Sequence, residues 1–237
     1  MPSQLATKKH AKYFQRLLRI MPNCSAEFDC SRLAVAFFAI SGLDILNCLN
    51  DLSEETKLEA INWIYRLQVT GAGPRSGFQP STTIPKDAPK YQCGHLAMTY
   101  IGLVTLLILG DDLSRVDKKS IIEGMRACQN PDGSFTAIIT GCESDMRFLY
   151  CACCISIILN DWSGIDKTKA IDYILKSIVS FYLFVFIILY IKSINKNWLC
   201  LLNFIIAQYL NNDYSHMMEQ WAKDLVLNHM EDLHIVL

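Results

Sequence analysis

Three segments of helical length are apolar nearly all round, and they alternate along the chain with amphipathic segments of similar length. The apolar segments are "SRLAVAFFAISGLDIL", "HLAMTYIGLVTLLIL" and "DMRFLYCACCISIIL". The amphipathic segments are "EETKLEAINWIYRLQ", "KKSIIEGMRACQ" and "KTKAIDYILKSI". A helix that is apolar on every side must be buried, whereas an amphipathic helix covers a core with one face. The alternation therefore predicts an inner and an outer set of helices.

The alternation has the regularity of a repeat. Aligning the apolar segments places Phe37, Tyr100 and Tyr150 in register. Gln68 and Gln129 each end an amphipathic segment ahead of a glycine and a phenylalanine, namely Gly77-Phe78 and Gly133-Ser134-Phe135. Helical hairpins of this kind cannot bury their faces alone, so they stack side by side. The pattern predicts an all-α fold of helical-hairpin repeats in which one end of the inner helices faces a common hollow.

Local signals support the same division into helices. The capping residues Ser53, Asp117 and Asp166 precede the three amphipathic segments. Loops rich in Gly, Pro, Asn and Asp, such as "GAGPRSGFQP" and "NPDGSF", separate the helices. No series of strands is predicted.

Composition limits the class of protein. The 237 residues are 51% apolar and 19% charged, which is enough to bury a substantial core in one large domain or two small ones. A formal net charge of -1 gives the whole chain no attraction to nucleic acid or to an anionic membrane, so neither is expected as a partner. Ten cysteines without a preceding secretory signal indicate free thiols in a reducing compartment.

The first 21 residues carry five cations and no acid, and two interpretations stay open. The segment has the composition of an organellar transit peptide. The pattern favours a basic surface helix whose apolar side packs inward. The residues expected on that inner side are Tyr13, Phe14, Leu17, Leu18 and Met21.

The third apolar segment holds the candidate functional residues. Glu143, Arg147, Tyr150, Cys151 and Cys154 recur at steps of three and four, so they are expected on one helical face. Glu143 and Arg147 form either an exposed ion pair of little energetic weight or part of a binding site. In the second interpretation, the Arg147 guanidinium receives a carboxylate or phosphate at the rim of the apolar hollow.

Two further features have residue types that occur in binding sites. His95, at the start of the second apolar segment, is the neighbouring polar group by repeat position, although a lone histidine is more often structural. The Cys151–Cys154 spacing is that of a CxxC motif, but the segment is apolar and has no second ligand pair at a usable interval. No metal site and no catalytic residue is predicted, and phosphate-loop, HExxH and GxSxG motifs do not occur.

The motifs closely resemble the β subunit of protein geranylgeranyltransferase type I, within the protein prenyltransferase family. They are "SRLAVAFFAISGLDIL", "GHLAMTYIGL", "ILGDDLSRV", "DGSF" and "ESDMRFLYCACCI", followed by "NDWSGID". The resemblance runs in order from about Lys12 to about Ser177. It implies part of an α/α barrel (toroid), about three of the family's six hairpins, for residues 1–177.

The resemblance implies a cytoplasmic transferase with defined partners. The family's β subunit pairs with the α subunit shared with protein farnesyltransferase and binds geranylgeranyl diphosphate. It attaches the lipid to the cysteine of CaaX proteins that end in Leu, such as small GTPases of the Rho and Rac type. Its zinc ion lowers the pKa of the substrate thiol so that a thiolate attacks C1 of the isoprenoid.

Several residues match positions with known roles in that family. Arg147, Tyr150 and Phe38 correspond to isoprenoid-binding residues. His95, Glu143 and Arg147 correspond to the group that receives the carboxylate of the peptide. Ala34 corresponds to a residue of the peptide pocket, where a threonine is usual, so peptide selectivity is expected to differ.

The family's zinc ligands are not found in this sequence. They are an Asp and a Cys one residue apart and a later His, and no Asp-x-Cys occurs in the chain. The histidines at 216, 229 and 234 stand in no matching context, and the residues that grip the diphosphate have no counterpart. We therefore expect a truncated chain with impaired catalysis. The alternative is a noncatalytic α-hairpin protein that binds the α subunit or a lipid.

Residues 178–237 are predicted to be a divergent hydrophobic and helical tail. The run "IVSFYLFVFIILYI" begins where the resemblance ends, and the residues that follow are rich in Ile, Asn and Lys. We interpret this tail as a translated intron or an alternative exon. Fourteen apolar residues are fewer than the roughly 20 that span a bilayer, so a membrane segment is not expected.

Overall fold

The computed structural model describes residues 6–19, 28–83 and 91–177, and the predictions for the tail, residues 178–237, lie outside them. Contacts divide the chain into two compact units, residues 1–130 with 134–165 and residues 131–133 with 166–237. In the described part, no helix is long and apolar enough to cross a membrane.

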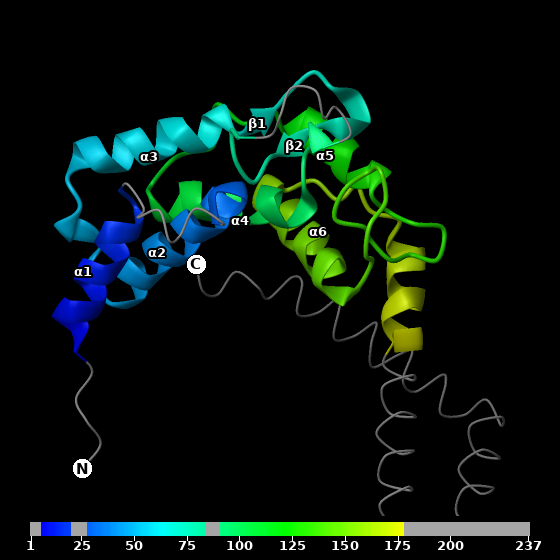
Figure 1. Cartoon of the computed structure of the whole chain (residues 1–237). Helices are drawn as coiled ribbons and strands as arrows, with labels where there is room; N and C mark the ends of the chain where they lie inside the picture. The colour runs from blue at the N-terminus through cyan, green and yellow to red at the C-terminus, as the bar shows by residue number, and fades with distance from the viewer. Residues whose placement is uncertain (1–5, 20–27, 84–90, 178–237) are drawn as a thin grey trace, which may run out of the picture. The chain divides into compact units, whose positions relative to one another are not determined.

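The first unit is built from helices joined by short turns (Figure 1). Its α-helices are α1 (Thr7–Leu17), α2 (Arg32–Ile45), α3 (Glu54–Arg66), α4 (Leu96–Ile108), α5 (Lys118–Ala127) and α6 (Met146–Leu159). The short elements are the 3-10 turns η2 (Leu49–Asp51) and η3 (Gly73–Arg75) and the strands β1 (Gln68–Val69) and β2 (Gly77–Phe78). The fold class is all-α, as the sequence predicts.

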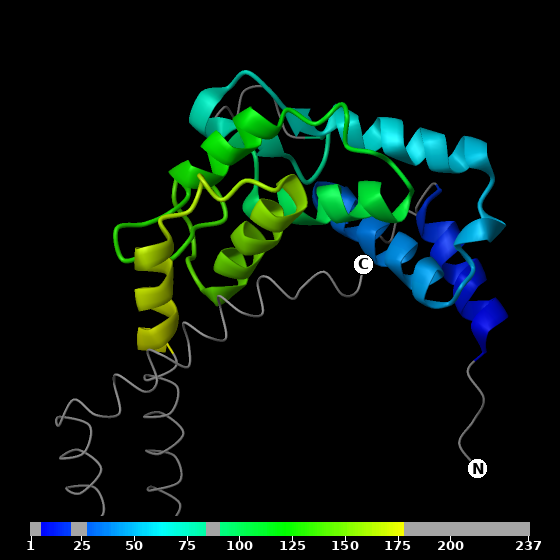
Figure 2. The ribbon, with the colours of Figure 1, turned by 180° about the vertical axis from the view of Figure 1, so that it is seen from behind.

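The predicted inner and outer sets of helices are confirmed. α4 packs against α2 on one side and α6 on the other, while α3 contacts α4 and α5 contacts α6. Figures 1 and 2 show α3 and α5 along the outer side of this row. Most residues of the inner helix α4 are buried and none is fully exposed, with Leu103 and Leu106 fully enclosed. Its buried Thr105 hydroxyl donates to the Ile101 carbonyl oxygen at 2.6 Å, which satisfies a polar group inside the apolar helix.

The repeated Gln and Phe positions become the same small turn in both repeats. Gln68 pairs with Phe78 across the β1–β2 ladder, and Gln129 forms an isolated bridge with Phe135. Both phenylalanine rings are completely buried. No strand series was predicted, yet these turns form short antiparallel pairings, because the loop must return the chain to place the aromatic ring in the core.

The expected capping residues occupy the N-terminal caps. The Ser53 hydroxyl accepts a hydrogen bond from the Thr56 amide at 3.2 Å, and the Asp117 carboxylate accepts one from the Ser120 amide at 3.1 Å. Each bond satisfies an amide that has no partner within the helix.

Replacing Ser53 with alanine is expected to lower the free energy of unfolding by about 1 kcal/mol, because the Thr56 amide loses its acceptor. Urea unfolding of the purified chain measures the loss. Ser53→Asp is the matched control and should retain most of the stability, since a carboxylate also caps. Equal losses in the two variants would contradict a capping role.

In the second unit, a helix covers residues 167–177. Asp166 caps it, since its carboxylate accepts from the Lys169 amide at 3.2 Å and pairs with the Lys169 ammonium at 2.9 Å. Gly133 has a φ of 91°, and a Cβ there would overlap the Lys169 carbonyl oxygen, so only glycine fits this position.

The N-terminal basic segment forms α1, which packs on α2. Ala11 is buried and Phe14 is half-buried, in agreement with the surface-helix interpretation. Tyr13 was predicted to point inward, but its side chain is 58% exposed, because the side of α1 that packs on α2 carries the buried Ala11 and the Phe14 ring. The predicted inward position of Met21 lies outside the described residues.

Candidate functional site

His95 is fixed at the N-terminus of the inner helix α4. Its Nδ1 accepts a hydrogen bond from the Met98 amide at 3.5 Å, and its own amide donates to the Phe78 carbonyl oxygen at 2.9 Å. Burial lowers the pKa of His95, although Glu143 acts in the opposite direction. The imidazole is therefore neutral near pH 7. Because Nδ1 accepts, the ring proton is assigned to Nε2, which can donate to a ligand.

Three backbone segments approach one another closely beside His95. A Cβ on the preceding residue, Gly94, would lie 2.5 Å from the Ser76 carbonyl oxygen. A Cβ on Gly124 of α5 would overlap the same oxygen, and one on Gly77 would lie 3.0 Å from the Cα of Gly94. We call Ser76, Gly77, Gly94 and Gly124 the glycine junction. It allows the contacts that hold the start of α4, and hence His95, in place.

Arg147 lies in the first turn of α6 between two carboxylates. Asp145, the N-cap of α6, accepts from the Arg147 amide at 2.8 Å and from its guanidinium Nη2 at 2.5 Å. Glu143 forms an ion pair with the same Nη2 at 3.4 Å. The guanidinium keeps the pKa of the Asp145 carboxyl below its usual range. The predicted Glu143–Arg147 ion pair is therefore present, but Glu143 precedes the helix instead of lying on its face.

Phe148 links His95 to Arg147. Its buried ring meets the His95 ring edge-on, with centroids 6.2 Å apart, and the Arg147 guanidinium lies 5.5 Å from the centroid of the same ring. His95, Glu143 and Arg147 thus come together at the N-terminal ends of α4 and α6. A neutral N–H donor and an exposed cation in one place provide the groups that bind a carboxylate. Asp145 and Phe148 were not predicted for this site, although the Asp immediately before the apolar segment is the expected position of a cap.

Tyr100 and Tyr150 form an aromatic wall on the inner helices. Their rings pack edge-on with centroids 5.7 Å apart, and their hydroxyls are 3.5 Å apart. This contact confirms the register predicted between the two repeats. The side chain of Tyr150 is 57% exposed, and its hydroxyl also forms a hydrogen bond with the Cys154 thiol. The hydrogen bonds to Tyr100 and Cys154 both raise the pKa of Tyr150. Cys151, by contrast, is buried and does not share the exposed face of Tyr150.

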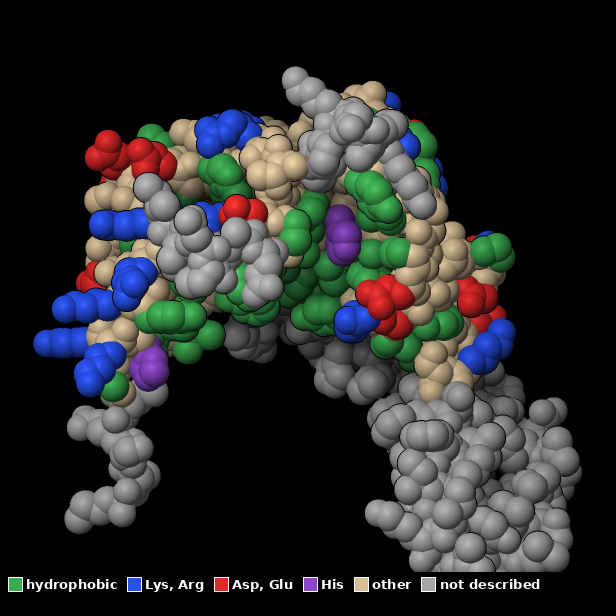
Figure 3. Space-filling view, in the orientation of Figure 1, with side chains coloured by type: hydrophobic (Ala, Val, Ile, Leu, Met, Phe, Trp, Pro, Cys, Tyr) green, Lys and Arg blue, Asp and Glu red, His purple; other side chains and the backbone are tan. Residues whose placement is uncertain are grey.

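Ala34 and Phe38 lie on α2, with α4 between them and α6. The Phe38 side chain is 65% exposed and packs against Phe37, with ring centroids 5.4 Å apart. Figure 3 shows hydrophobic side chains gathered over the middle of the described face, bordered by charged groups. The inner helices therefore present exposed aromatic surface that is suited to an apolar ligand.

The family model of the prenyltransferase alpha-alpha toroid domain matches residues 5–180. The chain belongs to this family. The chain also resembles part of individual prenyltransferase subunits. The chain is 37% identical over 202 residues to geranylgeranyl transferase type-1 subunit beta of Dictyostelium discoideum, covering 76% of this chain and 57% of that protein. It is 34% identical over 179 residues to the subunit of the same name from Arabidopsis thaliana, covering 70% of this chain and 47% of that protein.

A solved structure gives the same result. Candida albicans protein geranylgeranyltransferase-I complexed with GGPP matches with a TM-score of 0.64 and 25% sequence identity, covering 73% of this chain and 51% of that chain. The chain thus spans about half the length of the prenyltransferase subunits it matches. The predicted family and fold class are confirmed.

The described residues do not fit the zinc ion implied by the resemblance. Among them, no group of three or more His, Cys, Asp or Glu side chains is placed to hold a metal. Burial raises the pKa of Cys151 to about 11 and also raises the pKa of Cys154, so both CxxC thiols are protonated near pH 7. The CxxC cysteines are therefore packing residues of α6.

A separate cavity of about 490 Å³ lies between α1, α2 and α3. Leu18, Ala36 and Ile40 form part of its apolar wall, and Glu59 and Arg66 are charged residues in its lining. None of the predicted site residues lines it. The candidate site is the inner face described above, and this cavity lies outside it.

Proposed function

We propose that the chain acts as a β subunit of protein geranylgeranyltransferase type I. The observation that carries the proposal is the joint placement of His95, Glu143 and Arg147 at the edge of the aromatic face formed by Tyr100 and Tyr150. The names of the relatives and the geranylgeranyl diphosphate in the related solved structure support it. The partners are then the α subunit shared with protein farnesyltransferase and CaaX proteins that end in Leu, in the cytoplasm.

Each part of the site has a role in this proposal. Phe38 and Tyr150 contact the isoprenoid through their exposed rings. His95 donates from Nε2, and Arg147 contributes positive charge, to the terminal carboxylate of the peptide, while Glu143 orients Arg147. Arg147 also borders the isoprenoid, and Ala34 widens the peptide pocket. The first unit supplies all these groups.

The transfer step forms a bond between the cysteine sulfur and C1 of the isoprenoid, breaks the C1–O bond and releases diphosphate. In this proposal the described residues bind and orient the two substrates. They include no group of ligands for a zinc ion that would stabilise the cysteine thiolate. Because no Asp-x-Cys occurs in the chain, we propose that transfer is impaired while substrate binding persists.

Binding and transfer are therefore measured separately on the purified complex of this chain with the α subunit. We expect binding of labelled geranylgeranyl diphosphate, substoichiometric zinc, and transfer to a Leu-ending peptide far slower than in the Dictyostelium discoideum relative prepared in parallel. Stoichiometric zinc with equal turnover would contradict the impairment and retain the β-subunit assignment. Absence of lipid binding would contradict the assignment itself.

The second candidate function is a noncatalytic protein that binds the α subunit or a lipid. It is favoured by the protonated thiols of α6 and by the missing metal-ligand group among the described residues. The same experiment separates the two functions. Lipid binding without detectable peptide binding or transfer would support the noncatalytic protein.

A further inference from the structure

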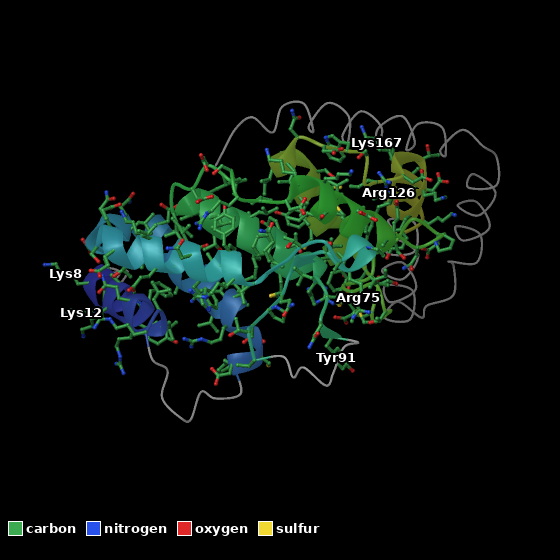
Figure 4. The ribbon with its side chains drawn as sticks, turned by 90° about the horizontal axis from the view of Figure 1, so that it is seen from above. Lys8, Lys12, Arg75, Tyr91, Arg126 and Lys167 are labelled. Carbon is green, nitrogen blue, oxygen red and sulfur yellow. The ribbon has the colours of Figure 1, made fainter. Side chains whose placement is uncertain are left out.

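Helix α1 carries its positive charges on one side. At 3.6 residues per turn, Lys8, Lys9, Lys12 and Arg16 fall within an arc of about 100° around the helix. All four side chains are exposed. We call these four residues the basic stripe. Figure 4 shows Lys8 and Lys12 extending away from the body of the first unit.

The packing of α1 fixes the direction of the basic stripe. Ala11 is buried, and the Phe14 ring lies so close to α2 that a Cβ on Gly42 would be 2.5 Å from it. At the C-terminal end of α1, the Arg32 guanidinium donates to the Arg19 carbonyl oxygen at 3.1 Å. These contacts hold α1 antiparallel to α2, with the stripe on the side facing away from α2.

Within the described residues, the stripe forms no ion pair. α1 contains no acidic residue, and none of its cations forms an ion pair with a carboxylate of residues 6–19, 28–83 or 91–177. Tyr13, which is 58% exposed, borders the stripe next to Lys9 and Arg16. Tyrosine is a residue type enriched at membrane–water interfaces.

We propose that the basic stripe of α1 docks the chain on the surface of a membrane that contains anionic phospholipid. A row of cations on a convex helix meets a planar anionic surface without needing a groove, and such clusters on amphipathic helices are typical of anionic-lipid binding. A specific protein partner would favour an apolar patch at the centre of its interface, and the stripe offers only Tyr13. The net charge of -1 for the whole chain conceals this local concentration of charge. The proposal stands independently of the proposed transferase function.

Cosedimentation of the full chain with vesicles tests the proposal. Vesicles of phosphatidylcholine with phosphatidylserine should bind the chain, and rising salt should release it. Each Lys or Arg near such a surface contributes about fivefold to partitioning, so Lys8→Gln/Lys12→Gln should lower binding about 25-fold. Adding Lys9→Gln and Arg16→Gln should abolish the dependence on phosphatidylserine.

The matched control is Lys118→Gln/Lys119→Gln, which removes two exposed lysines from α5. It should leave vesicle binding unchanged, and circular dichroism should show equal helix content in all variants. Vesicles of phosphatidylcholine alone measure the contribution of the apolar run 178–191. Binding that is equal with and without phosphatidylserine, or unchanged by the fourfold substitution, would overturn the proposal. Binding to soluble polyglutamate with none to vesicles would also overturn it and indicate an acidic protein partner.

Discussion

Replacing Gly124 with alanine is expected to destabilise the first unit by about 3 kcal/mol, although alanine is the better helix former. Gly124 lies within α5, and an added Cβ would overlap the carbonyl oxygen of Ser76. That oxygen cannot easily retreat, because the Gly94 backbone packs against it and the Gly94 amide donates to the Arg75 carbonyl oxygen at 2.7 Å. Urea unfolding of the purified chain measures the loss.

Gly102→Ala in α4 is the matched control for this variant. Gly102 is also a buried helical glycine, but the nearest atoms to an added Cβ belong to the Phe78 ring at 3.3 Å, not to a backbone. A ring can shift by a few tenths of an ångström, so the change in stability should stay within about 1 kcal/mol. Equal losses of stability in the two variants would show that the backbones at the glycine junction approach no more closely than ordinary packed groups.

The helical architecture could be predicted because its signals are local and periodic. The uniformly apolar "HLAMTYIGLVTLLIL" had to be buried, and it is the buried helix α4. The Gln and Phe positions gave the register of the repeat, which returns as the Gln68–Phe78 and Gln129–Phe135 pairings. The alignment of the apolar segments also paired Tyr100 with Tyr150 correctly.

The parts that could not be predicted depend on contacts distant in sequence. Nothing in the local sequence distinguishes Gly124 from an ordinary helical glycine, because the requirement for glycine comes from the close approach of the Ser76 carbonyl oxygen. Glu143 was placed on the helical face by its spacing, but Asp145 caps α6 first and leaves Glu143 in the preceding loop. Tyr13 is exposed because α1 turns Phe14, not Tyr13, toward Gly42 of α2. The sequence of α1 alone does not show which of its apolar residues faces α2.

Arg147→Gln is expected to weaken binding of a Leu-ending peptide to the complex with the α subunit by about 10- to 100-fold. Asp145 and Glu143 hold Nε and Nη2 of the guanidinium, but Nη1 has no hydrogen-bond partner among the described residues, and the side chain is 70% exposed. The Nη1 group can therefore donate to the peptide carboxylate with its charge already oriented. Glutamine cannot supply that charge. Fluorescence anisotropy with a labelled peptide measures the affinity.

A peptide with a C-terminal carboxamide separates loss of this contact from loss of structure. It has no carboxylate to pair with Arg147, so the wild-type chain and Arg147→Gln should bind it equally. The fold of α6 should persist, because the cap bond to Asp145 comes from the Arg147 amide and survives the substitution. Affinity for geranylgeranyl diphosphate, measured in parallel, tests the second role of Arg147. A loss confined to the lipid would assign Arg147 to the isoprenoid alone, and equal losses for both peptides would remove it from carboxylate recognition.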